Sequence, residues 1–162
     1  MSAATTPTAR LRRIEVSVHV GTDRMAASDD PLFLELQGPG GREFRLAMAH
    51  GKALRRGAAD HFVLAGAADP STNVAFPELN DPAVPPIPLE GVTCVVLRKG
   101  QEPIPNVRGH GEMDDRLQVL SVEVVLVPEG DGAPRRFRRE GPFWLGLVCG
   151  ERAAIPPDES RA

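Results

Sequence analysis

Short runs in which apolar and polar residues alternate recur along this chain and constrain its fold more than any other feature. The first run, residues 14–20, reads IEVSVHV, with isoleucine or valine at every second position. A period of two is typical of a β-strand that buries one face. Further runs of apolar or alternating residues predict strands at 32–37, 43–47, 60–65, 91–97, 117–127, 135–139 and 142–148.

The residues between these runs predict turns rather than helices. Glycine and proline each occur 16 times in 162 residues, and both interrupt helices. The sequence Gly38-Pro39-Gly40-Gly41 predicts a tight turn between two strands. About eight short strands joined by turns favour an all-β antiparallel sandwich or barrel.

The chain is the length of a single domain. We expect a disordered tail at 1–10, a single β domain at 11–150 and a polar C-terminal tail at 151–162. Within the domain, residues 66–90 contain six prolines and predict a long inserted loop, because proline cannot donate a hydrogen bond to a sheet.

Charge and hydropathy exclude several classes of protein. The 19 basic and 22 acidic residues give a net charge of −3, which predicts no nucleic-acid partner. No run approaches the ~18 apolar residues of a transmembrane helix, and the N-terminus lacks an apolar signal. We therefore expect a cytoplasmic protein. Cys94 and Cys149 lie in apolar runs and predict buried free thiols.

The motifs of common enzymes are absent. There is no Gly-x-Ser-x-Gly, phosphate-binding loop or dinucleotide fingerprint. His110 and Glu112 have the His-x-Glu spacing of a zinc deaminase, but no Pro-Cys-x-x-Cys follows. An enzyme centred on His110, Glu112, Asp114 and Asp115 is the least favoured hypothesis, since no nucleophile or complete metal site accompanies this cluster.

Two loops are rich in acidic residues. One contains Asp29 and Asp30, and the other contains Asp114 and Asp115. Calcium binds where several carboxylate and carbonyl oxygens converge from loops, and loops at one end of a sandwich can converge in this way. The alternative is that these acids are solvated or form turns through their own side chains.

An arginine-rich segment near the C-terminus suggests a second site. Strand alternation places Arg136 and Arg138 on one face, and Arg135 and Arg139 on the other face together with Phe137. One interpretation is a solvated edge strand protected from aggregation by charge. The other is a surface for an anionic lipid or an acidic protein partner. The residues are Arg135, Arg136, Arg138 and Arg139.

The first part of the chain resembles the PLAT/LH2 family, a β-sandwich module found in lipoxygenases, lipases and polycystins. The most specific similarity is in LRRGAADHFVL, residues 54–64, which is similar to the family's Arg-Gly-x-x-Asp-x-Phe stretch. The matching positions are Arg56, Gly57, Asp60 and Phe62. The segments IEVSV (14–18), DDPLFLELQG (29–38) and FRL (44–46) resemble earlier strands of the family.

This resemblance implies an eight-stranded antiparallel β-sandwich and a non-catalytic module that engages a lipid or protein partner, sometimes with calcium. It implies Asp29 and Asp30 as the first ligands and Asp114 and Asp115 as the second pair. The alternative function is a structural subunit that self-associates into an oligomer through strand edges and the proline-rich loop.

Overall fold

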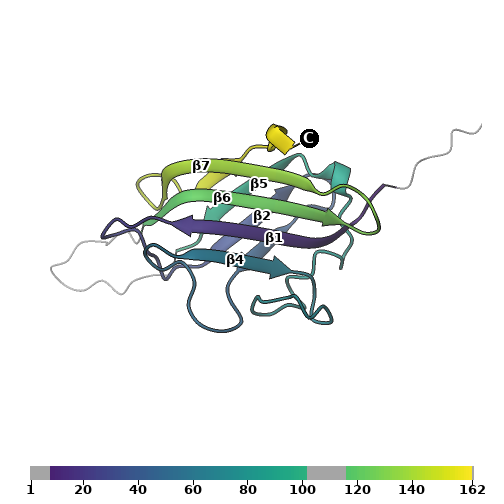
Figure 1. Cartoon of the computed structure of the whole chain (residues 1–162), viewed down its shortest axis with the longest axis horizontal. Helices are drawn as coiled ribbons and strands as arrows, with labels where there is room; N and C mark the ends of the chain where they lie inside the picture. The colour runs from purple at the N-terminus through teal and green to yellow at the C-terminus, as the bar shows by residue number, and fades with distance from the viewer. Residues whose placement is uncertain (1–7, 102–115, 162) are drawn as a thin grey trace, which may run out of the picture.

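Two four-stranded antiparallel sheets pack face to face in the computed structural model, which describes residues 8–101 and 116–161. The strand order is β4-β1-β6-β7 in one sheet and β3-β2-β5-β8 in the other (Figure 1). This confirms the predicted eight-stranded β-sandwich. The strands are β1 (Leu11–Val20), β2 (Leu32–Gln37), β3 (Glu43–Leu46), β4 (Ala59–Leu64), β5 (Cys94–Lys99), β6 (Leu117–Pro128), β7 (Arg135–Leu145) and β8 (Arg152–Ile155); two 3-10 turns are η1 (Leu89–Gly91) and η2 (Glu159–Arg161).

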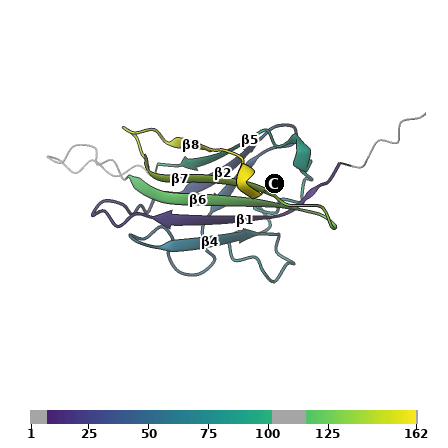
Figure 2. The ribbon, with the colours of Figure 1, turned by 45° about the horizontal axis from the view of Figure 1, so that its top comes forward.

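The core lies between the two sheets and follows the alternation in the sequence. Alternate residues of β1, among them Ile14, Val16 and Val18, are fully buried. The facing residues of β2, such as Leu34, are equally buried. Figure 2 shows the two layers with the strands of one sheet crossing behind those of the other. Each strand therefore buries its apolar face and leaves the polar face outside, which is the arrangement that period two predicts.

The last strands differ from the sequence-based prediction. The predicted strand 135–139 and the first part of the predicted strand 142–148 form the single strand β7, which ends at Leu145 and has a register shift opposite Val119 and Ser121. Gly141 lies at this irregularity, where a Cβ would stand 2.3 Å from the carbonyl oxygen of Val119. A glycine therefore lets the strand continue past Pro142, where the sequence indicated a break.

The eighth strand lies in the segment that we expected to be a polar tail. In β8, Ala153 and Ile155 face the core, and the strand pairs with β5. Its four residues are too few for a clear periodic signal, and Pro156 and Pro157 follow directly. At the other terminus, β1 begins at Leu11, close to the predicted boundary.

The proline-rich loop, residues 66–90, covers the open side of the sandwich where β3 and β4 form sheet edges. Asn73 pairs with the edge of β4: its Oδ1 accepts from the amide of Val63 at 2.8 Å, and its Nδ2 donates to the carbonyl of His61 at 2.8 Å. Asn80 accepts from the amide of Arg45 on β3 at 2.8 Å. Two asparagine side chains thus replace a neighbouring strand and protect both edges.

The opposite side of the sandwich is covered by the C-terminal segment. The amide of Arg138 donates to Pro156, and the amide of Asp158 donates to Arg136, each at 2.9 Å. Arg139 reaches across to the carbonyl of Ala154 on β8 at 3.1 Å. The chain's own segments therefore cover the edges of β3, β4 and β7 over part of their length, which leaves less edge for association with another copy.

Candidate functional site

Several loops gather at one end of the sandwich, on the left in Figure 1, and we call this the loop end. It comprises residues 21–31, 47–58 and 146–151. Backbone hydrogen bonds join them to each other and to the strand ends: Gly57 donates to Gly21 at 2.8 Å, Gln118 to Ala26 at 2.9 Å, and Lys99 to Glu151 at 2.8 Å. The loop end therefore brings together residues that are far apart in the sequence.

A buried ion pair lies beneath the loop end. The ammonium of Lys99, 1% exposed, contacts the Oδ2 atom of Asp30, which is 9% exposed. The same Nζ lies 3.4 Å from the carbonyl of Gly100, and the amide of Asp30 donates to the hydroxyl of Ser28. The lysine therefore links the end of β5 to the loop before β2.

Sequence analysis did not single out Lys99, although its position carried a signal. Val95, Leu97 and Lys99 occupy alternate positions of β5, and all three are buried on the inward face. A lysine that continues an inward-facing apolar series needs a buried anion. Asp30 supplies that anion.

Asp29, the neighbouring acid, is in a different environment. Its side chain is 73% exposed and pairs with Arg55 at 3.2 Å and with Lys52 at 4.0 Å. Asp29 and Lys52 line a pocket of about 470 Å³ that also contacts Asp30 and Met48. The structure therefore separates two adjacent acids that the sequence treated as equivalent.

The calcium prediction stays a prediction. Asp114 and Asp115 lie outside the described residues, as do His110 and Glu112. Among residues 8–101 and 116–161, no three His, Cys, Asp or Glu side chains lie close enough to hold a metal. Asp29 and Asp30 both contact basic side chains instead.

An apolar tip projects from the loop end between β7 and β8. Leu147 is 52% exposed and Val148 is 86% exposed. A hydrogen bond from the amide of Gly146 to the carbonyl of Gly150, at 2.9 Å, closes this loop. Met25, half exposed, belongs to the same end. Large aliphatic side chains held outward by a closed turn indicate a contact surface.

The described part of the loop end carries more exposed basic than acidic side chains. The bases of its three segments are Arg24, Lys52, Arg55 and Arg56, and the acids outside the buried pair are Asp23, Asp29 and Glu151; Arg116, directly before β6, is a further exposed base. These described residues have a surplus of positive charge, although the whole chain has a net charge of −3. Such a surface complements an anionic partner.

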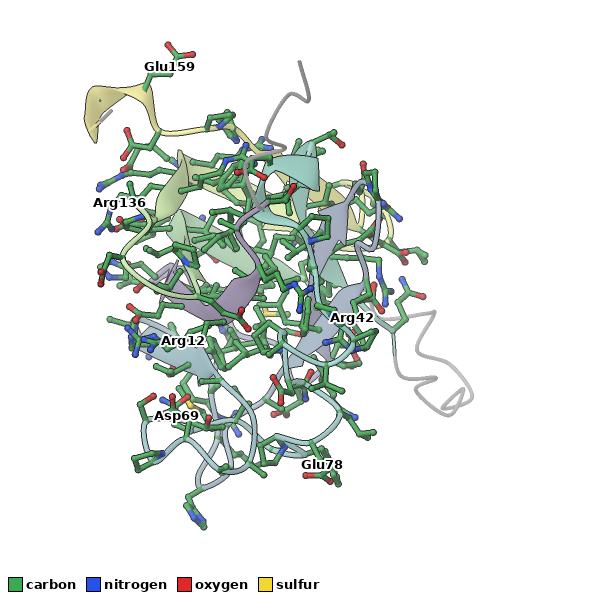
Figure 3. All side chains as sticks on the ribbon, turned by 90° about the vertical axis from the view of Figure 1, so that its right-hand side faces the viewer. Arg12, Arg42, Asp69, Glu78, Arg136 and Glu159 are labelled. Atoms are coloured by element: carbon green, nitrogen blue, oxygen red, sulfur yellow. The ribbon has the colours of Figure 1, made fainter. Side chains whose placement is uncertain are left out.

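The arginines of β7 do not form a free cationic patch. On the inward side, Arg135 donates to the carbonyls of Leu89 at 2.8 Å and Val92 at 2.9 Å. On the outward side, Arg136 pairs with Glu123 at 3.2 Å and Arg138 with Glu140 at 2.5 Å. Figure 3, viewed from the end opposite the loop end, shows Arg136 on the outer side of its sheet, with Arg42, which directly precedes β3, on the side of the other sheet.

Arg135 is therefore expected to act in folding. Replacing it with alanine removes two hydrogen bonds and a guanidinium 5.2 Å from the centre of the Phe137 ring. We expect a stability loss of about 1–2 kcal/mol, and so a melting temperature lower by about 2–8 °C. The matched control, Arg138→Ala, removes an exposed pair and should leave the melting temperature unchanged. Equal melting temperatures for the two variants would contradict the assignment.

The outer face of the other sheet also neutralises its own charges. Arg98 donates two hydrogen bonds to Glu43 and stacks over Phe33, at 4.3 Å from the ring centre. Gln37 donates to Glu35, and together with Arg152 it lowers the pKa of that carboxyl below its ordinary value. This face offers less unbalanced charge than the loop end.

Both cysteines are free, as predicted, but the prediction that both are buried is wrong for Cys149. Cys94 is half-buried, whereas Cys149 is exposed beside the apolar tip. Trp144 on β7 is half-buried, with the guanidinium of Arg116 at 4.9 Å from its ring centre.

One cluster on the first sheet has the residue types of a hydrolytic triad. The hydroxyl of Ser17 lies 2.9 Å from Nδ1 of His61, whose Nε2 is 4.0 Å from Glu15. Ser17 and His61 are neighbours on paired strands, and this part of β1 pairs on both sides with β4 and β6. Its amides are therefore engaged in the sheet and form no oxyanion hole, so the geometry does not support acyl transfer.

No protein-family model and no curated protein matches this sequence. In the part of the chain that the structure describes, no helix is long and apolar enough to cross a membrane.

Solved structures share the fold at low sequence identity. The alpha-toxin of Clostridium perfringens avian strain SWCP matches with a TM-score of 0.55 and 10% identity, over 95% of this chain and 33% of the toxin. The alpha toxin of Clostridium absonum matches with a TM-score of 0.52 and 10% identity, over 94% and 33%. A coral 8R-lipoxygenase matches with a TM-score of 0.51 and 13% identity, over 91% and 17%.

This chain spans only a third of each toxin and about a sixth of the lipoxygenase. The likeness therefore shows the fold and not the activity of these larger proteins. Two four-stranded antiparallel sheets, matched over more than nine-tenths of the chain, agree with the resemblance in the sequence. The chain has the PLAT/LH2-like, C2-like β-sandwich fold.

Proposed function

We propose that the protein is a non-enzymatic module that docks on anionic lipid surfaces through its loop end. The observation that carries this proposal is the apolar tip, Leu147 and Val148, at an end of the molecule whose described residues carry more basic than acidic side chains. Aliphatic side chains enter the boundary between headgroups and acyl chains, while lysine and arginine attract anionic headgroups.

The fold supports this assignment. In the coral 8R-lipoxygenase, calcium activation proceeds via a C2-like domain, so a sandwich of this kind serves there as a regulatory module. The flat, hydrogen-bonded Ser17–His61 cluster gives no support for an enzyme. An accessory role therefore accounts for the described surface better than a catalytic one.

The tip residues provide the direct test. Leu147→Ser/Val148→Ser should bind vesicles of phosphatidylserine and phosphatidylcholine about 10- to 100-fold more weakly than the unaltered protein, because two aliphatic side chains no longer enter the lipid. Co-sedimentation with vesicles measures this. Higher salt should also weaken binding, and pure phosphatidylcholine should bind poorly.

The matched control is Leu79→Ser/Val84→Ser. These two residues are 71% and 65% exposed in the proline-rich loop, which lies along the side of the sandwich where β3 and β4 form sheet edges. The control should bind vesicles like the unaltered protein. Equal binding by the tip variant and the control, or no binding by any protein, would contradict docking through the loop end.

Self-association is the second candidate function, and the apolar side chains of the proline-rich loop favour it. Phe76, Leu79 and Val84 are all more than half exposed. In this case the Leu79→Ser/Val84→Ser variant would convert an oligomer to a monomer in size-exclusion chromatography. A monomeric unaltered protein would exclude this alternative.

A further inference from the structure

We propose that the ammonium of Lys99 takes the place of a bound divalent cation at the loop end, so that docking needs no calcium. Membrane docking itself rests on the function proposed above. The proposal that a lysine replaces a metal does not depend on that function, because it is tested on the protein without vesicles.

The surroundings of the Lys99 ammonium are those of a cation site. A carboxylate oxygen of Asp30 contacts it directly, and the carbonyl oxygen of Gly100 lies 3.4 Å away. Carboxylate and carbonyl oxygens are the ligands that calcium takes in proteins. Here they face a positive charge that is covalently part of β5.

The position of this charge is fixed by the core. Val95 and Leu97 precede Lys99 on the same inward face of β5, and the lysine itself is 1% exposed. Its neighbours in the chain are also held: the amide of Lys99 donates to Glu151, and the amide of Gly100 donates to Pro31 at 2.7 Å. The ammonium therefore cannot swing out to make room for a metal without breaking the end of the strand.

The second predicted ligand is also balanced by the chain. Asp29 contacts Arg55 and Lys52, so a metal approaching it meets two positive charges. Lysine and arginine thus contact both predicted ligands, Asp29 and Asp30. Because these basic groups belong to the chain itself, we expect the loop between β1 and β2 to keep its conformation whether or not calcium is present.

Thermal unfolding of the whole chain tests the proposal first. The melting temperature should differ by less than about 1 °C between millimolar calcium and a chelator, because nothing binds the folded state selectively. A rise of several degrees that the chelator reverses would overturn the proposal.

Lys99→Met provides the second test. It vacates the cation position and removes the ammonium that contacts the buried Asp30 carboxylate, so the variant should melt at a lower temperature and recover several degrees in millimolar calcium. Lys52 is the only other lysine in the chain and is exposed, so Lys52→Met is the control and should not respond to calcium. If Lys99→Met folds and its melting temperature responds to calcium no more than that of Lys52→Met, the proposal that Lys99 replaces a metal ion is wrong. If Lys99→Met does not fold, the melting temperature of the unaltered protein in calcium and in chelator is the test of the proposal.

Vesicle binding separates this proposal from the proposed function. Equal binding to phosphatidylserine vesicles in calcium and in chelator supports both. Binding only in calcium would leave docking intact and overturn the role of Lys99. The absence of binding in either condition, together with a melting temperature that ignores calcium, would remove docking and leave the lysine assignment standing.

Discussion

Asp30→Ala is expected to destabilise the protein by about 3–5 kcal/mol, the largest effect that we expect from a single surface-loop substitution. The side chain that it removes faces the buried ammonium of Lys99. Without Asp30 that charge stays in a low-dielectric environment, with only the carbonyl of Gly100 nearby among the contacts described above. In a domain of this length, the melting temperature should fall by about 6–20 °C.

Two variants show whether the pair or the loop is responsible. Asp29→Ala alters the adjacent acid, which is 73% exposed, and should change the melting temperature by less than about 1 °C. Asp30→Leu/Lys99→Met removes both charges at similar volume and should restore most of the stability, because no buried charge is left unpaired. If Asp29→Ala and Asp30→Ala were equally stable, the burial of this ion pair would be wrong.

The contrast between these two acids marks the limit of what the sequence could predict at the site. Adjacent aspartates in a polar loop have no local signal that separates a buried residue from an exposed one. Their difference depends on a lysine 69 positions along the chain. The alternation of β5 could have flagged Lys99 as inward-facing, but its partner needed the tertiary structure.

The fold was more predictable because its signal is local. Strands such as β1 and β2 bury every second residue, so periodicity in a single segment indicates both the strand and its face. The failures occurred where the signal is short or interrupted: β8 has four residues, and β7 runs through Gly141-Pro142. Pairing with β5 and β6 decides these two strands, and such long-range contacts are absent from a local pattern.

The arginines of β7 show the same limit for a surface. Alternation correctly placed Arg136 and Arg138 on one face and Phe137 with the other two on the opposite face. It could not show that Glu123 and Glu140 accompany the first pair, or that Arg135 and Arg139 bind carbonyls. A charged segment becomes a binding surface only where its charges are not matched by the rest of the fold.

The side chain of Asn80 is the basis of the second large prediction. It is 4% exposed and makes three hydrogen bonds: it accepts from the amide of Arg45 at 2.8 Å and donates to the carbonyls of Ala75 at 3.0 Å and Phe76 at 3.2 Å. The carbonyl of Phe76 also accepts from the backbone amides of Leu79 and Asn80. Phe76 has a left-handed conformation, with φ of 53°, which is unfavourable for a bulky side chain. Asn80 therefore fixes both the edge of β3 and the turn that presents Phe76.

Asn80→Ala should lower stability by about 2–4 kcal/mol, because it leaves the amide of Arg45 and two carbonyls without this partner. The melting temperature should fall by about 4–16 °C. Leu79→Ala is the matched control in the same turn: this side chain is 71% exposed, so its removal should leave stability nearly unchanged. Hydrogen exchange locates the effect, since the amide of Arg45 should lose its protection in Asn80→Ala while the centre of β1 keeps it. If the amide of Arg45 stays protected from exchange in Asn80→Ala, another group must pair with the β3 edge. The conclusion that the proline-rich loop protects that edge through Asn80 would then be wrong.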